Sequence, residues 1–154
     1  MLFWDVTAEY VNKDIFELCK IEYEKSYHVE KHKEEIKVAK WLIEKFGGKI
    51  VLCDEVNHKN EKYTDYIWNG KMWNLKGISS AKAANSAIRK GVLQVIKNPG
   101  GIILELKKDD IKIDEVMYYI NDRMRRISNI QIDIMLKKYD MVVKIVRYKK
   151  IKRD

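Results

Sequence analysis

The dipeptide Asn69-Gly70 constrains the fold of this chain more than any other local feature. It separates two short runs rich in aromatic and apolar residues, and in that setting Asn-Gly is the strongest short-range signal for a two-residue β-hairpin. A turn of this kind determines which residues of the two strands face each other. The predicted pairs are Trp68 with Lys71, Ile67 with Met72, Tyr66 with Trp73, and Asp65 with Asn74.

This register brings polar residues together. Side chains alternate across a strand, so Asp65, Asn74 and Lys76 are predicted to share one face of the hairpin. A carboxylate, an amide and an amine in one place suit a hard cation and a phosphate better than they suit a core. Trp68 and Trp73 fall on the opposite face, where we expect them to pack under helices.

Helices and strands are expected on both sides of the hairpin. Apolar residues at helical spacing predict helices over residues 31–46, 81–97 and 113–126. Short apolar runs predict strands over residues 49–53, 102–106, 130–136 and 141–148, of which the last two form a second hairpin. Helices that join strands in this order predict an α/β fold with a central mixed β-sheet flanked by helices.

The N-terminal part of the chain differs from the remainder. Residues 1–30 are interpreted as a helical extension, because a loosely helical pattern links Phe16, Leu18, Ile21 and Tyr23. Residues 31–154 then form the main domain, and the length of 154 residues suits a single core.

Charge and cysteine content limit the class of partner. The formal net charge of +8 favours a polyanionic partner such as nucleic acid, although a lysine-rich surface that only aids solubility would carry the same charge. Cys19 and Cys53 are far apart and lack metal-binding spacing, so a reducing compartment such as the cytoplasm is expected. No apolar run is long enough for a membrane span.

An additional acid lies on the helix before the hairpin. Glu35 shares a helix face with Ala39 and Leu42, so its carboxylate is predicted to point inward, whereas Glu34 is predicted to be solvated. An inward carboxylate needs a partner, and the polar face of the hairpin is a suitable one.

This order of residues resembles the PD-(D/E)XK nucleases, in which a helical glutamate, an aspartate at a strand start and an acid two residues before a lysine form the site. Residues 32–148 are more closely similar to the C-terminal toxin domains of contact-dependent growth inhibition systems, a family also found fused to phage-like head proteins. The segments that carry the resemblance are residues 32–35, 46–52, 64–76, 88–90, 98–106 and 146–150.

The resemblance implies a PD-(D/E)XK-like sheet and a metal-dependent endoribonuclease that cuts tRNA. Glu35, Asp65 and Asn74 would hold the divalent cation, Mg²⁺ or Mn²⁺, and Lys76 would lie beside the attacking water or the scissile phosphate. The family has an acid where this chain has Asn74, so metal affinity and activity are expected to be weakened or lost. The resemblance also implies a cognate immunity protein, and delivery from another cell as part of a larger secreted toxin.

Two basic groups are predicted to contact nucleic acid. Arg89 and Lys90 lie on the helix after the hairpin, which should flank the site. The C-terminal run adds Arg147, Lys149 and Lys150, with Tyr148 between them for base stacking.

Three other functions stay open at this point. The same fold and metal could cut DNA, because no residue separates the two substrates. A degenerate nuclease fold could bind nucleic acid or a protein without cutting, which the missing acid favours. A basic interaction domain unrelated to nucleases would need no metal and no cluster of Asp65 with Lys76.

Overall fold

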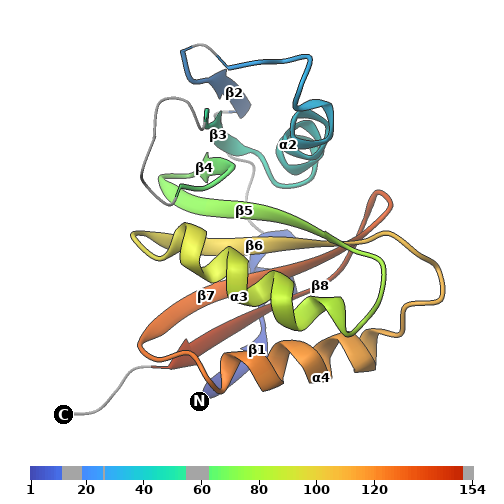
Figure 1. Ribbon diagram of the computed structural model, residues 1–154. Helices are drawn as coiled ribbons and strands as arrows, with labels where there is room; N and C mark the ends of the chain where they lie inside the picture. Colours follow the sequence, from blue (N-terminus) through green and yellow to red (C-terminus); the bar gives the residue numbers. More distant parts are fainter. Residues whose placement is uncertain (12–18, 26, 55–62, 151–154) are drawn as a thin grey trace.

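The computed structural model describes residues 1–11, 19–25, 27–54 and 63–150. Its framework is one eight-stranded mixed sheet in the order β1-β8-β7-β6-β5-β4-β3-β2 (Figure 1). The strands are β1 (Leu2–Asp5), β2 (Cys19–Tyr23), β3 (Gly48–Leu52), β4 (Tyr66–Trp68), β5 (Lys71–Ile78), β6 (Pro99–Leu106), β7 (Ile130–Lys138) and β8 (Met141–Lys150). The helices are α1 (Thr7–Val11), α2 (Lys33–Phe46), α3 (Ala83–Val95) and α4 (Ile113–Met124). The predicted α/β class with a central mixed sheet is confirmed.

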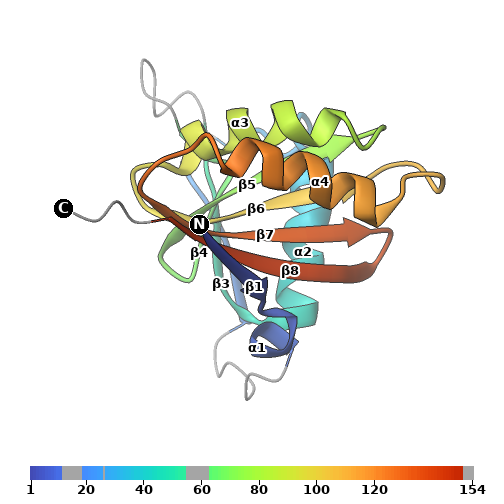
Figure 2. The same cartoon turned by 90° about the horizontal axis from the view of Figure 1, so that it is seen from below.

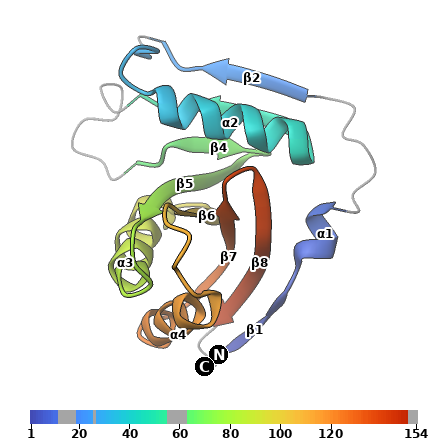
Figure 3. The same ribbon diagram turned by 90° about the vertical axis from the view of Figure 1, so that its right-hand side faces the viewer.

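The sheet separates two apolar cores. Helices α3 and α4 lie side by side over one face, and α2 covers the other (Figures 2 and 3). The α3 and α4 side buries Ile88, Val92, Ile120 and Met124 against apolar residues of β5 to β8. The α2 side buries Ala39, Leu42, Trp68 and Trp73, so the two tryptophans pack as the sequence predicted.

The central hairpin has the predicted turn and register. Asn69 and Gly70 both adopt positive φ, of 51° and 81°, as the central residues of a type I′ turn do. Strands β4 and β5 pair Tyr66 with Trp73, Ile67 with Met72, and Trp68 with Lys71. The local turn chemistry was therefore enough to set this part of the sheet.

Parallel pairs joined by helices form the middle of the sheet. Helix α3 connects β5 to β6 and α4 connects β6 to β7, and both strand pairs are parallel. Strand β6 begins at Pro99, three residues before the predicted start, because Pro99 already pairs with Met72 of β5. Gly101 is needed there, since a Cβ on it would lie 2.3 Å from the backbone oxygen of Asp133. The predicted hairpin of β7 with β8 is confirmed.

The prediction of a helical extension over residues 1–30 is wrong for the part that the structure describes. Only Thr7–Val11 is helical; β1 adds to the sheet beside β8, and β2 adds in parallel to β3 at the opposite edge. Ile21 and Tyr23 lie in β2, whereas Phe16 and Leu18 fall outside the described residues. Partners that are distant in sequence decided these strands, and local periodicity carries no information about them.

Among the described residues, no helix has the length and apolar character needed to cross a membrane. Cys53 is buried, and neither it nor Cys19 forms a disulfide in this part of the chain.

Candidate functional site

Helix α2 presents Glu35 to the sheet from its first turn. The Glu35 carboxylate accepts a hydrogen bond of 3.0 Å from the Tyr27 hydroxyl and lies 3.5 Å from Nδ1 of His32. The Tyr66 hydroxyl of β4 donates to the Glu35 backbone carbonyl over 2.6 Å, which ties the start of the helix to the hairpin. Glu35 is half-buried and Glu34 is exposed, so the predicted inward acid of this helix is confirmed.

Asp65 lies where β4 begins, and its side chain bonds to the backbone of β5. Oδ2 of Asp65 accepts the Leu75 N–H over 2.7 Å, and the neighbouring Thr64 hydroxyl donates to the Trp73 carbonyl. These two contacts lie on either side of Asn74 along β5. The Asp65 carboxylate is thereby held beside Asn74, as the predicted register requires.

Two carboxyl groups meet at this point. Burial raises the pKa of Asp65 from its ordinary value of 3.8 to about 7, and the charge of Glu35 and a hydrogen bond to it act in the same direction. The Leu75 N–H and the Lys76 ammonium oppose that rise. Two neighbouring carboxyl groups repel each other when both are ionised. Such a pair is therefore more stable when it holds a proton or a cation.

Lys76 completes a polar group on the α3 side of β5. Burial lowers the pKa of Lys76, and the charge of Lys90 on α3 lowers it further, while Asp65 opposes the change. The structure thus brings Glu35, Asp65 and Lys76 into one electrostatic neighbourhood, and Lys90 borders it.

Asn74 lies on the same face of β5 as Lys76, and only 1% of it is exposed. Its Nδ2 donates to Oε1 of Gln94 on α3. Its Oδ1 is buried and has no hydrogen-bond partner within the described part of the chain. A buried carbonyl oxygen without a donor is rare in folded proteins, and a bound ion is one physical reason for it.

The donor set can be compared with the needs of a divalent cation. The described residues contain no group of three His, Cys, Asp or Glu side chains placed to hold a metal ion. They do contain two adjacent carboxyl groups and the open amide oxygen of Asn74. Mg²⁺ takes oxygen ligands and usually keeps several waters, so these residues fit such an ion through few protein ligands.

The predicted nucleic-acid residues lie in separate places. Arg89 and Lys90 are exposed on α3, and Lys90 is near Lys76. Lys150 donates to the Arg125 carbonyl after α4. Lys149 is exposed on the other face of β8, and the remainder of the C-terminal run lies outside the described residues.

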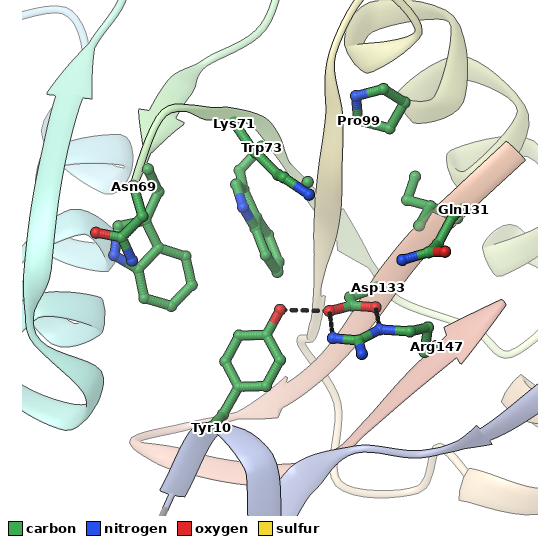
Figure 4. A pocket seen from close by; sticks show the side chains of 11 residues that line it. Tyr10, Asn69, Lys71, Trp73, Pro99, Gln131, Asp133 and Arg147 are labelled. Atoms are coloured by element: carbon green, nitrogen blue, oxygen red, sulfur yellow. Dashed lines mark hydrogen bonds and ion pairs between the residues drawn. The ribbon is translucent and has the colours of Figure 1, made fainter. Parts of the chain in front are cut away.

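Arg147 is held in a polar cluster on the α2 side of the sheet (Figure 4). Its Nε and Nη2 donate to the two oxygens of Asp133 over 2.8 and 3.0 Å, and its Nη1 donates to Glu9 over 3.2 Å. The Tyr10 hydroxyl donates to the same Asp133 over 2.5 Å. The cluster forms one wall of a pocket whose other walls include Trp73, Lys71 and Gln131.

The stacking role predicted for Tyr148 is wrong. This side chain is fully buried, and its ring stacks on that of Phe3 with 5.4 Å between the ring centroids. Its hydroxyl donates a hydrogen bond of 2.5 Å to Oδ1 of Asn121. Alternation along β8 turns Tyr148 into the core under α4, so the aromatic residue within the basic run is a core residue.

Sequence reasoning missed the contributions of Tyr27 and Asp133. An acid inside the apolar strand at Asp133 was a readable signal, because a carboxylate in a buried strand needs a cationic partner. Tyr27 carried no comparable signal, since its contact with Glu35 depends on how β2 and α2 meet.

Comparisons with known proteins agree with this fold. No protein-family model matches the chain, and none of the curated proteins matches it. Among solved structures, the chain is similar to a chain of the CdiA-CT/CdiI toxin and immunity complex from Burkholderia pseudomallei. The TM-score is 0.54 at 15% sequence identity, over 84% of this chain and 98% of that chain. At this identity the likeness establishes a shared fold.

Proposed function

We propose that this chain is a metal-dependent endoribonuclease of the PD-(D/E)XK type that acts as a tRNA-cleaving toxin domain. The observation that carries the proposal is the meeting of Glu35, Asp65 and Lys76 from three separate elements of the fold. Two carboxyl groups beside a partly buried ammonium are the groups that metal-assisted phosphodiester hydrolysis uses.

Each side chain has a role that follows from its surroundings. Asp65 and Glu35 hold the cation, with Asn74 Oδ1 as a neutral third oxygen. A divalent cation held there, Mg²⁺ or Mn²⁺, would lower the pKa of a water molecule and would stabilise charge on the phosphate. Lys76 lies beside the scissile phosphate and compensates the charge that grows there, and Lys90 extends the positive potential toward the adjacent phosphates.

Asn74 in place of an acid weakens the proposed site. The amide keeps one oxygen ligand but lacks a full negative charge, so the cation is held less firmly. We therefore expect this chain to have low nuclease activity. Replacing Asn74 with an acid should increase that activity. Asn74→Asp suits the site better than the longer Asn74→Glu, because the position is almost completely buried.

tRNA is the proposed substrate, and a toxin role is the proposed biological function. The family resemblance of residues 32–148 favours tRNA, and the net charge of +8 suits either nucleic acid. The shared fold with a chain of a toxin and immunity complex supports a toxin role, with an immunity protein as partner. Delivery from another cell and action in the cytoplasm belong to the same proposal. DNA is the alternative substrate of the same site.

A non-catalytic binding module is the second candidate function. The specific observation behind it is the engagement of Asn74 with Gln94, which places an uncharged pair where an acid would hold the metal. Such a module would bind RNA or a protein without cutting and would gain no activity from the restored acid.

The test compares total tRNA incubated with this chain, with Asn74→Asp, with Asn74→Glu, and with Asn74→Asp combined with Lys76→Ala. Each reaction contains Mg²⁺, Mn²⁺ or EDTA, and a parallel set contains duplex and single-stranded DNA. Lys40→Ala in the Asn74→Asp background is the matched control, since Lys40 is exposed on α2 and no contact with nucleic acid is predicted for it.

Discrete tRNA fragments that need the metal, increase with the acid and disappear without Lys76 would support the proposal. Cleavage of DNA with intact tRNA would move the proposal to the DNA enzyme. No cleavage of either substrate by the Asn74→Asp and Asn74→Glu variants would favour the binding module.

A further inference from the structure

Strand β5 and helix α3 present matched rows of polar side chains to each other. Asn74 donates a hydrogen bond to Gln94, and the charge of Lys90 lowers the pKa of Lys76. Two residues along a strand cover about 6.6 Å, and four residues along a helix cover about 6 Å. Because α3 runs back along β5, the earlier strand residue meets the later helix residue, and both pairs are in register.

From this geometry we propose that Gln94 is a positioning residue, which captures the amino end of the Asn74 amide and turns its carbonyl oxygen toward the cation. The inference rests on the proposed function, because it concerns the same metal site. In this role Gln94 acts on the cation only through Asn74.

The need for such a residue comes from the chemistry of an amide. A carboxylate offers an oxygen at both ends, whereas an asparagine offers one oxygen and one amino group that cannot bind a cation. Rotation by half a turn about the last side-chain bond would therefore remove the ligand. Gln94 prevents this rotation, since its Oε1 accepts from Nδ2 and leaves Oδ1 without a partner in the described part of the chain.

The burial of the pair explains why the orientation is held. Asn74 is 1% exposed, so its amino group depends on Gln94 as the acceptor more than an exposed amide would. An oxygen held open in a buried site has an energetic cost, and a cation that binds there removes that cost. Residues that orient a ligand in this way typically change metal affinity by about 10- to 100-fold when they are replaced.

The test is the Mn²⁺ affinity of the full chain, measured by isothermal titration calorimetry at pH 8 without RNA. Gln94→Met keeps the length of the side chain and removes the acceptor. Gln94→Glu keeps an acceptor that cannot donate, so it holds the Asn74 amide in the same orientation. Gln131→Met is the matched control, an identical change at an exposed glutamine of β7.

We expect Gln94→Met to weaken Mn²⁺ binding by about tenfold, and Gln94→Glu to bind at least as tightly as the unmodified chain. Gln131→Met should leave the affinity unchanged. If Gln94→Met folds but binds Mn²⁺ normally, or if Gln94→Glu binds as weakly as Gln94→Met, the positioning role is refuted.

Asp65→Ala separates this outcome from a failure of the proposed function. Loss of binding in Asp65→Ala together with normal binding in Gln94→Met would refute the positioning role and leave the metal site in place. Mn²⁺ affinity that neither change alters would refute the metal site and the inference with it. Circular dichroism of each variant confirms that the comparison is made on folded protein.

Discussion

The guanidinium of Arg147 donates from two nitrogens to the two carboxylate oxygens of Asp133, over 2.8 and 3.0 Å. This bidentate pair joins β8 to β7, and Glu9 and Tyr10 extend it to the N-terminal segment. An arginine in this arrangement has its donors engaged within the protein. The pair therefore contributes to the packing of the fold.

Replacement of Arg147 should reduce stability more than it reduces RNA binding. Arg147→Met leaves the buried Asp133 carboxylate with Tyr10 as a donor, which is costly for a charge. We expect a loss of about 2 kcal/mol in the free energy of unfolding, less than for a deeply buried pair because 21% of the Arg147 side chain is exposed. Urea unfolding measures it. A strong loss of RNA affinity at unchanged stability would contradict this assignment.

Lys90 should contribute directly to RNA affinity. Its exposed ammonium lies near Lys76, on the side of the sheet where the proposed substrate phosphate would bind. Lys90→Met should weaken RNA binding and reduce the slope of affinity against salt by about one unit. Filter binding at several salt concentrations measures both quantities, with Lys149→Met on the other face as the comparison. If Lys90→Met and Lys149→Met weaken RNA binding equally, the bound RNA does not lie mainly along α3.

The Asp65 carboxyl should make stability depend on pH. Its folded-state pKa of about 7 lies above its ordinary value of 3.8, so between these values the folded protein keeps a proton that the unfolded chain has released. The free energy of unfolding contributed by this group is greatest at low pH and is lost as the pH rises to about 7. Asp65→Asn removes the ionisation while an amide oxygen can still accept the Leu75 N–H.

We therefore expect Asp65→Asn to be more stable than the unmodified chain at pH 8, by about 1 to 3 kcal/mol, and to differ little at pH 4. Urea unfolding across this range measures the difference. Mn²⁺ should stabilise the unmodified chain at pH 8 and leave Asp65→Asn unaffected. Parallel stability curves for the two proteins would show that the Asp65 carboxyl does not titrate in this window.

Tyr148 should act only through the core. Tyr148→Phe removes the hydrogen bond to Asn121 and keeps the stacking on Phe3. We expect a loss of about 1 kcal/mol in stability and no change in RNA affinity. A clear loss of RNA affinity in this variant would mean that the ring becomes accessible to bases.

Sequence patterns predicted the parts of the fold that local chemistry determines. The positive φ values at Asn69 and Gly70 set the register of β4 and β5, and helical spacing located α2, α3 and α4 to within a few residues. The inward direction of Glu35 also followed from its helix face. These features depend on residues that are close together along the chain.

The features that sequence reasoning missed depend on distant partners. Strands β1 and β2 were read as helix because their pairing with β8 and β3 leaves no local trace. The engagement of Arg147 depends on Asp133 in the neighbouring strand and on Glu9 at the other end of the chain. The same holds for Gln94, whose contact with Asn74 needs the packing of α3 on β5.

The placement of β1 beside β8 also has a consequence for how the protein folds. Phe3 pairs with Tyr148, so strand β1 finds its neighbour in a strand that lies far from it along the sequence. Closing a loop of that length is slow compared with forming the central hairpin or the helices. Until β1 docks, the backbone groups along the outer side of β8 are open to strands of other molecules. Dilute conditions and time during refolding should therefore matter more for this chain than its compact central hairpin suggests.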